Sequence, residues 1–362
     1  MAKTLGYFVE SLSGKPGLTD SQAAVPGILG DACPACGASE MCVLFAATDR
    51  LYATTSRVFQ IVECGQCRLI RLHPQPTPQE LRDYYPADYW VEPEATVTDR
   101  FQKFYRRMVL RDHLRFAERA IRESEAPGIV LDVGCGSGVF LKRLAEREEK
   151  SGRAGKIGRA EDGEGGRRKV VGLDFAVDAA TATWRHSGVP AICATLSRAP
   201  FASSSCAAIT MFHVLEHLYD PGSYLRAAHE LLAPGGRLIV QVPNAASWQF
   251  LLFGERWKEL EVPRHLVHFR RQDLEALLDH CGFEILRSKH FSLRDNPQGM
   301  AVSLAPRLDP TGRRLRRVPE TPRMCLSKDL AFFALLAACL PFTLLEAACH
   351  AGSTVMIEAR KK

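Results

Sequence analysis

The stretch that decides the fold is IVLDVGCGSGVFL, residues 129–141. Its first five residues are apolar apart from Asp132, which is typical of a buried strand. Glycines at 134, 136 and 138 then break the run, and apolar residues at helical spacing follow. A strand, a tight glycine turn and a helix form the first half of a nucleotide-binding βαβ unit. A side chain at these glycines would hold a ligand away from the backbone N–H groups and the positive helix start.

A second apolar run, Val170 to Leu173, ends in Asp174, where a carboxylate can accept hydrogen bonds from both hydroxyls of an adenosine ribose. Together, LDVGCGSG and VVGLD resemble the class I S-adenosylmethionine-dependent methyltransferases. A dinucleotide-dependent dehydrogenase is an alternative, but Val139 stands where the third glycine of its fingerprint would fall. The other alternative is an ordinary glycine turn that binds no ligand.

The resemblance implies an α/β fold with a seven-stranded Rossmann-like methyltransferase sheet, whose last strand is antiparallel, and a small N-terminal zinc ribbon. It also implies contacts with S-adenosylmethionine from the glycine turn and from the ends of the second, third and fourth strands. These expected contacts are Asp132, Gly134, Cys135, Gly136, Gly138, Asp174, Phe175, Thr195, Leu196 and His213. Thr195 and Ala207 stand where the family usually has acidic residues. This departure leaves a catalytically inactive cofactor-binding module as an alternative function.

Composition sets wide bounds on the protein. The chain has 362 residues, 46% of them hydrophobic, enough for one large domain and one or two small modules. Its net charge of +6 is too weak to indicate nucleic acid by itself. No apolar run of signal-peptide length stands at the start, so we expect a cytoplasmic location and a reducing environment for the 12 cysteines.

Two C-x-x-C pairs, Cys33 with Cys36 and Cys64 with Cys67, flank a β-like segment. This spacing is typical of a four-thiolate zinc ribbon. A closed four-thiolate site has no open coordination position, so the Zn²⁺ would be structural. Four thiols without a metal are one alternative, and a nucleic-acid-binding zinc-ribbon protein is another.

The pattern divides the chain into segments of different character. We expect a flexible leader at 1–30, a zinc ribbon at 31–75, an aromatic connector and helix at 76–126, a methyltransferase core at 127–293 with a disordered insertion at 148–169, and a basic and apolar helical insertion with the final strand at 294–362. Acidic residues are interleaved with the basic ones in the insertion, so nucleic acid is not the expected partner. The connector is expected near the cofactor or packed on the next helix.

Two segments resemble the acceptor side of these enzymes. HVLEHLYDP at 213–221 matches the VLEH-x-x-DP of a bacterial branch and is close to the E-x-x-E-H of ubiquinone-pathway O-methyltransferases. Residues 244–269, here called the lid segment, resemble the family's substrate-side lid and end in PRHLVHF. The resemblance implies a base or polar clamp among His213, Glu216, His217, His265 and His268. A base must reach the acceptor's proton, which favours His217 or His265. No metal is expected here, because His213 replaces the first acid. Capping and packing are the alternative roles.

The expected reaction is methylation of a small-molecule acceptor on oxygen or carbon, with a sugar, a lipid-linked compound or a secondary metabolite as substrate. Residues 330–349 are almost wholly apolar, with Pro341 in the middle and four arginines upstream between 313 and 317. A single bilayer crossing would separate the last strand, 354–359, from its sheet. We therefore expect either an interfacial hairpin turning near Pro341, with peripheral contact on the inner face of the membrane, or a buried helix pair.

Overall fold

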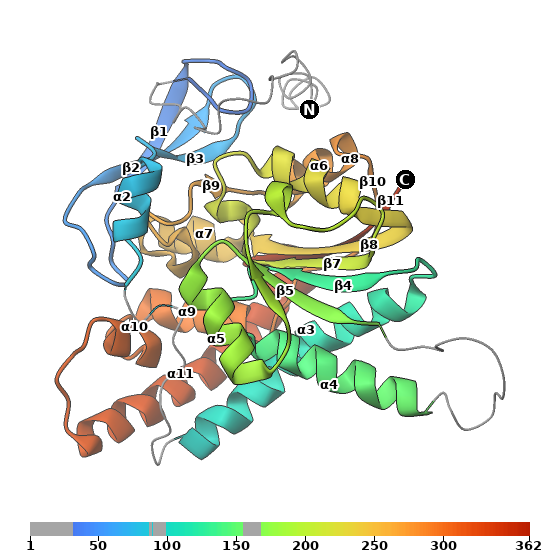
Figure 1. Ribbon diagram of the computed structural model, residues 1–362. Coiled ribbons are helices and arrows are strands. Elements are labelled where there is room, and N and C mark those ends of the chain that lie inside the picture. The colour runs from blue at the N-terminus through green and yellow to red at the C-terminus, as the bar shows by residue number, and fades with distance from the viewer. Residues whose placement is uncertain (1–31, 87–88, 90–98, 155–167) are drawn as a thin grey trace.

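The computed structural model describes residues 32–86, 89, 99–154 and 168–362 (Figure 1). The expected leader and most of the expected insertion lie outside these residues. The first part of that insertion is not irregular, because helix α4 runs from Val139 to Ala154. The helix that begins after the glycine turn therefore continues further than expected.

The main sheet has seven strands in the order β10-β11-β8-β7-β4-β5-β6. Their bounds are β4 Ile129–Val133, β5 Val170–Asp174, β6 Ala191–Cys193, β7 Cys206–Phe212, β8 Leu232–Pro243, β10 Phe283–Lys289 and β11 Thr354–Lys361. β11 lies between β8 and β10 and is antiparallel to both, which confirms the predicted fold class. The chain runs outward from β4 to β6 and then returns to β7 on the other side of β4. Open α/β sheets bind ligands where their strand order reverses in this way.

Helices cover both faces of this sheet (Figure 1). α3 Asp99–Glu123, α4 and α5 Val177–Ser187 pack on one face, and α6 Pro221–Leu231 and α8 Arg271–His280 pack on the other. Alternate side chains along the strands point to opposite faces of the sheet and pack in two hydrophobic cores. Val130 and Ala208 pack with Leu114 and Ile121 of α3, whereas Leu131 packs in the core on the other face. The period-2 pattern of buried strands thus explains why the apolar runs read as nearly continuous.

A second, four-stranded sheet has the order β1-β2-β3-β9. β1 Met41–Ala47, β2 Phe59–Cys64 and β3 Ile70–His73 come from the ribbon, and α2 Pro78–Asp83 follows them. The fourth strand, β9 Val267–His268, belongs to the lid segment and pairs with β3 at Ile70 and Arg71. The ribbon therefore shares a sheet with the lid segment.

The C-terminal insertion is helical, with α9 Asp295–Leu304, α10 Pro310–Leu315 and α11 Pro322–Ala348. The expected hairpin and the expected helix pair are both wrong, because α11 is one continuous helix through Pro341. An internal proline removes one helical hydrogen bond and costs about 3 kcal/mol. Packing of Phe332, Leu336 and Cys339 against α9 offsets that cost. By length and composition, α11 is the one helix in the described part of the chain that could cross a membrane.

Candidate active site

The glycine turn after β4 and the end of β5 meet through a hydrogen bond. The N–H of Gly136 donates to Asp174 Oδ2 at 3.1 Å, and the N–H of Ala176 donates to Asp174 Oδ1 at 2.9 Å. All three glycines of the turn have positive φ. A Cβ at Gly134 would lie only 2.6 Å from Val214 Cγ2, beyond the end of β7. The turn therefore needs glycine for two reasons: its backbone has positive φ, and a side chain at Gly134 would clash with Val214.

Asp174 retains capacity for a ligand. A carboxylate offers about four acceptor positions, and the two amides use two of them. Burial raises the pKa of Asp174, and the backbone amides oppose that shift only partly. The next residue, Phe175, has 57% of its surface exposed. A carboxylate beside an exposed ring suits a nucleoside, because the first can accept from ribose hydroxyls and the second can stack on a base.

Three other expected cofactor contacts have buried side chains. Asp132 accepts a 2.6 Å hydrogen bond from Thr210 on the neighbouring strand, and its burial raises its pKa to about 7 despite that bond. The Cys135 thiol accepts from Thr183 of α5, and Leu196 packs in the core. Thr195, in contrast, is exposed at the start of the short helix η1 Leu196–Arg198.

A buried polar cluster follows β7. His213 has a left-handed backbone, with φ 55°, and its Nδ1 lies 3.1 Å from Glu216 Oε1. Its Nε2 lies 3.6 Å from Asp295 Oδ1 and 2.8 Å from the side-chain amide of Gln241. Burial lowers the pKa of His213, but the two carboxylates outweigh it and raise the pKa to about 10. The raised pKa favours the protonated ring, with Nδ1–H donating to Glu216, over a free base.

The sequence did not point to three members of this cluster. Asp295 begins α9 and accepts 2.6 and 2.7 Å hydrogen bonds from Ser292 and Gln241. His113 of α3 is 1% exposed, and its Nε2 lies 3.4 Å from Asp295 Oδ2. Gln241 and His113 could have been suspected from the sequence, because each is a polar residue among mainly apolar neighbours in its strand or helix. Asp295 left none, since only the tertiary fold brings α9 to the end of β7.

His217 and His265 come together although they lie on different segments. Their rings pack edge to face, with the ring centroids 4.6 Å apart. His217, at the end of the short helix η2 Leu215–His217, has its Nδ1 3.1 Å from the Tyr85 hydroxyl. His265 is buried, with its Nδ1 2.7 Å from the Glu259 carbonyl, so Nδ1–H donates and Nε2 keeps its lone pair. Burial, then the neighbouring histidines, hold the pKa of His265 well below its usual range. With Glu216, these rings offer one oxygen and two nitrogens within 4.8 Å, a spacing that could hold a cation.

The other lid residues are held in the protein interior. His268 pairs with β3 through β9, and burial lowers its pKa to about 4. Arg264 is fully buried and forms a two-bond ion pair with Asp49 of the ribbon, with N–O distances of 3.0 and 3.1 Å. Tyr89 of the connector donates to Glu261 of the lid at 2.9 Å. The described part of the connector thus contacts the lid segment.

The four ribbon cysteines converge as expected. The Cys33 and Cys67 sulfurs lie 3.5 Å apart, as do those of Cys36 and Cys64, and all four fall within 4.8 Å of one another. Tetrahedral Zn²⁺ with Zn–S bonds of about 2.3 Å requires sulfurs about 3.8 Å apart, so the donor set fits this ion.

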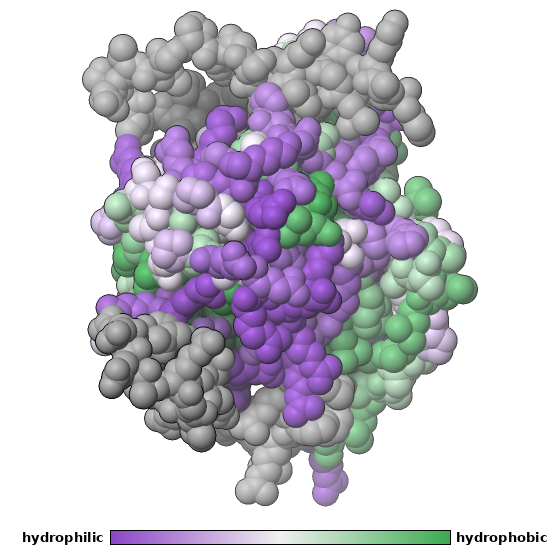
Figure 2. Space-filling view, turned by 90° about the vertical axis from the view of Figure 1, so that its right-hand side faces the viewer, coloured by the Kyte–Doolittle hydropathy of each residue, from purple (hydrophilic) through white to green (hydrophobic). Residues whose placement is uncertain are grey.

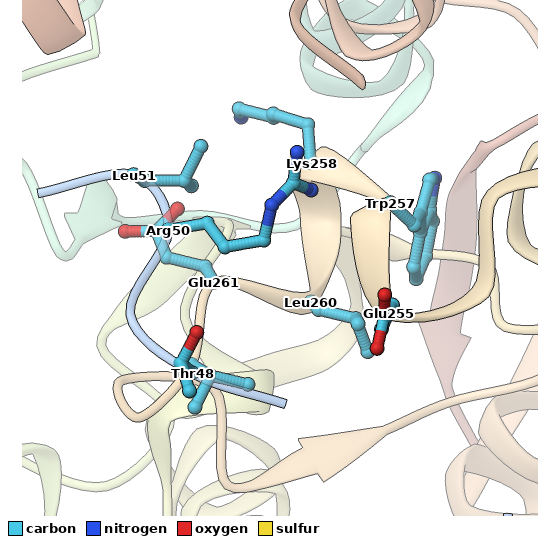
Figure 3. A pocket seen from close by; sticks show the side chains of 9 residues that line it. Thr48, Arg50, Leu51, Glu255, Trp257, Lys258, Leu260 and Glu261 are labelled. Carbon is cyan, nitrogen blue, oxygen red and sulfur yellow. The ribbon is translucent and has the colours of Figure 1, made fainter. Parts of the chain in front are cut away.

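A small hollow lies elsewhere, between the loop after β1 and the lid segment (Figure 3). Thr48, Arg50 and Leu51 line one side, and Trp257 and Lys258 lie among the lid residues on the other. None of the expected cofactor or acceptor residues lines it. The hollow therefore lies at the contact between the ribbon and the lid segment, and we do not assign it as the substrate pocket.

Comparisons with known proteins agree with this geometry. The family described as "Methyltransferase domain" matches residues 101–288. A protein of Mycolicibacterium smegmatis, named a probable S-adenosylmethionine-dependent methyltransferase, is 26% identical over 159 residues, which cover 43% of this chain and 52% of that protein. The ubiquinone biosynthesis O-methyltransferase of Pseudomonas paraeruginosa is 26% identical over 168 residues, 43% of this chain and 64% of the relative. The chain thus spans between about half and two thirds of the length of these curated relatives.

Among solved structures, 1,6-didemethyltoxoflavin-N1-methyltransferase of Burkholderia thailandensis, with its substrate and S-adenosylhomocysteine bound, is similar with a TM-score of 0.42 and 15% identity. The match covers 86% of this chain and 98% of that one.

Proposed function

The chain belongs to the methyltransferase domain family, and from this premise we propose that it transfers a methyl group from S-adenosylmethionine to an oxygen or carbon atom of a small-molecule acceptor. One observation carries the cofactor half of the proposal: the amide of Gly136 is hydrogen-bonded to Asp174 where the strand order reverses. This contact presents a glycine-rich backbone and a carboxylate at one edge of the sheet. Phe175 adds an exposed ring beside them.

When bound, S-adenosylmethionine supplies a methyl carbon made electrophilic by the adjacent sulfonium. The protein must align the acceptor with that carbon and exclude water. Gly134, Gly136 and Gly138 would let the ligand approach the backbone, and Asp174 would hold the ribose. Asp132, Cys135 and Leu196 would shape the site through their backbone and packing, since their side chains are buried.

His217 and His265 are the groups that we propose for proton removal from the acceptor. His265 is neutral because burial lowers its pKa, and its Nε2 lone pair is turned away from the Glu259 carbonyl. His213 is instead proposed to act as a fixed positive charge and hydrogen-bond donor, because Asp295 and Glu216 keep it protonated. His268 is assigned to structure, since it lies in β9, the strand that pairs with β3.

The ribbon is proposed to hold one structural Zn²⁺ through Cys33, Cys36, Cys64 and Cys67. Three of these residues are buried, and the sulfur spacing fits a closed tetrahedral site. In this proposal the ion stabilises the sheet that receives β9 and takes no part in methyl transfer.

Calorimetric titration with S-adenosylmethionine tests the cofactor site. We expect a dissociation constant on the order of 1 µM, roughly −8 kcal/mol. Gly136→Val and Asp174→Ala should each abolish or strongly weaken binding. The valine side chain would occupy the space in which the ligand approaches the backbone of the glycine turn, and the alanine would remove the carboxylate that accepts hydrogen bonds from the ribose. Asp178→Ala is the matched control, since Asp178 is an exposed carboxylate on the same βα unit. Unchanged titrations for both site variants would rule out this cofactor assignment.

The acceptor requires a separate experiment. Untargeted metabolite profiling of a deletion strain against wild type should reveal a compound that lacks one methyl group. Purified protein should then methylate that compound, with label from methyl-labelled S-adenosylmethionine appearing on oxygen or carbon. Cofactor binding without any methylated product would instead favour an inactive cofactor-binding module, the reading suggested by Thr195 and Ala207.

A further inference from the structure

The polarity of α11 is reversed relative to that of an ordinary surface helix. From Asp329 onward its polar residues Asp329, Thr343 and Glu346 are buried, whereas Leu330, Leu344 and Leu345 are 61%, 49% and 56% exposed. Every exposed residue between 330 and 348 is Leu, Ala or Pro. A surface helix of a globular protein normally places its charged side chains outward.

The buried polar residues fix this orientation. Asp329 pairs with the Arg313 guanidinium of α10. Glu346 accepts from the backbone N–H and the side-chain amide of Gln249 at 2.9 and 2.8 Å. Turning the helix over would leave these carboxylates unpaired, so the apolar side is held outward by specific contacts.

The exposed apolar surface continues onto a neighbouring helix. α7 Trp248–Phe253 begins against the C-terminal half of α11, where the ring centroids of Trp248 and Phe342 lie 6.1 Å apart. Leu251 and Leu252 of α7 are 75% and 62% exposed. Together with Leu330, Leu344 and Leu345 they are called the apolar flank below. Figure 2 shows apolar surface gathered along one side of the molecule beside a hydrophilic face.

The chemistry of this flank favours lipid over protein as its occupant. Protein interfaces carry about one hydrogen bond per 100–200 Å². The exposed side chains of α11 from Leu330 onward offer no hydrogen-bonding group. Residues 305–329, which lead into them, have seven Arg and Lys against three Asp and Glu. Arg313 is buried against Asp329, and the exposed basic residues are Arg307, Arg317 and Arg323. A basic segment adjoining an apolar face matches an anionic bilayer surface.

We propose that the apolar flank docks the protein on the surface of an anionic lipid bilayer, with α11 lying in the interface. The helix does not span the bilayer, because its two buried carboxylates bind the protein core and β11, only a few residues later, pairs with β8 and β10. This proposal is independent of the methyl acceptor.

Vesicle co-sedimentation of the full chain tests the proposal. Wild type should pellet with vesicles of phosphatidylcholine and phosphatidylglycerol, and less with phosphatidylcholine alone. Leu330→Glu combined with Leu345→Glu should reduce the partition coefficient at least tenfold, since each half-exposed leucine is worth roughly fivefold on burial. Val43→Glu with Val58→Glu, on residues 50% and 60% exposed in the ribbon, is the matched control and should bind as wild type does. Equal melting curves would show that both double variants fold.

A charge variant separates the two contributions. Arg323→Gln, at an exposed position in the first turn of α11, should weaken binding about fivefold on anionic vesicles and leave binding to neutral vesicles unchanged. No sedimentation of wild type, or equal sedimentation of the leucine variant, would overturn the proposal. So would a wild-type dimer that ignores vesicles and dissociates in the leucine variant, because the flank would then join two copies. Resistance to carbonate extraction would point to a spanning helix instead.

Discussion

Replacing Asp49 by Asn tests whether one buried ion pair joins the ribbon to the lid segment. The side chains of Arg264 and Asp49 are both fully buried, and their N–O distances are 3.0 and 3.1 Å. The guanidinium also donates to the carbonyls of Tyr84 and Val262 at 2.8 and 3.2 Å. Asn keeps the size of the side chain but removes its charge. It also replaces one accepting oxygen by an NH2 group, so the change removes the ion pair together with part of its hydrogen bonding.

The expected cost follows from what remains around Arg264. Removing one partner of a buried pair typically costs 3–5 kcal/mol, because the other charge is left uncompensated. Here Glu261 Oε1 stays 3.3 Å from the Arg264 Nε, so we take the lower end, about 3 kcal/mol. At roughly 2–4 °C per kcal/mol for a domain of moderate size, Tm should fall by about 6–12 °C.

Chemical denaturation and thermal melting measure this cost directly. Glu123→Gln is the control, because its ion pair with Arg119 is half exposed and should be worth less than about 0.5 kcal/mol. Equal losses of stability in the two variants would refute the reasoning, since burial would then have no bearing on the strength of the pair.

The same pair predicts a pH dependence. Burial raises the pKa of Asp49, but the Arg264 guanidinium outweighs it and lowers the pKa below 3.8. A carboxyl group with a lowered folded-state pKa adds stability above pH 3.8, and this is lost as the pH falls through the folded value. The stability gap between wild type and Asp49→Asn should therefore be constant near neutrality and shrink in acid. A gap that widens in acid would contradict this sign.

Three further outcomes are expected. Protein purified without chelator under reducing conditions should contain about one zinc per chain by elemental analysis, and Cys64→Ser should lose it. His217→Ala or His265→Ala should cut turnover by about 10²–10⁴ while cofactor affinity stays within a few fold, and near-normal turnover in both would exclude them as the base. Asp295→Asn should lower the pKa of His213 from about 10, followed by NMR of the imidazole. The raised pKa of His213 stabilises the fold below pH 6.5, and that contribution should disappear as the pH rises through about 10.

The main sheet could be predicted because its signals are local. The central strands β4, β5 and β7 are short apolar runs, and the glycine turn and Asp174 mark the ends of two neighbouring strands. The strand order then follows from the family's topology, including the return of β11 between β8 and β10.

The arrangement of the proposed acceptor residues could not be predicted from the sequence, because it depends on contacts between distant segments. His217 and His265 were both expected, but nothing local shows that their rings pack together or that Glu216 joins them. Asp295 sits in an unremarkable stretch and acquires its role through the position of α9. Pro341 is a local break signal that tertiary packing overrides. Arg264 also depends on a distant segment, because the ribbon supplies the buried carboxylate that pairs with it.

The two-residue strand β9 connects these parts of the molecule. On one side it pairs with β3, which follows directly from the second cysteine knuckle. On its N-terminal side it follows closely after Arg264 and His265. The backbone carbonyl of Arg264 lies 3.1 Å from His217 Nδ1. A disturbance of the ribbon can therefore reach both histidines through hydrogen bonds and a short run of backbone. The contact between Gly136 and Asp174 belongs to the other sheet and shares none of these bonds. In the proposed assignment, the ribbon therefore supports the acceptor edge, while the core alone forms the cofactor edge.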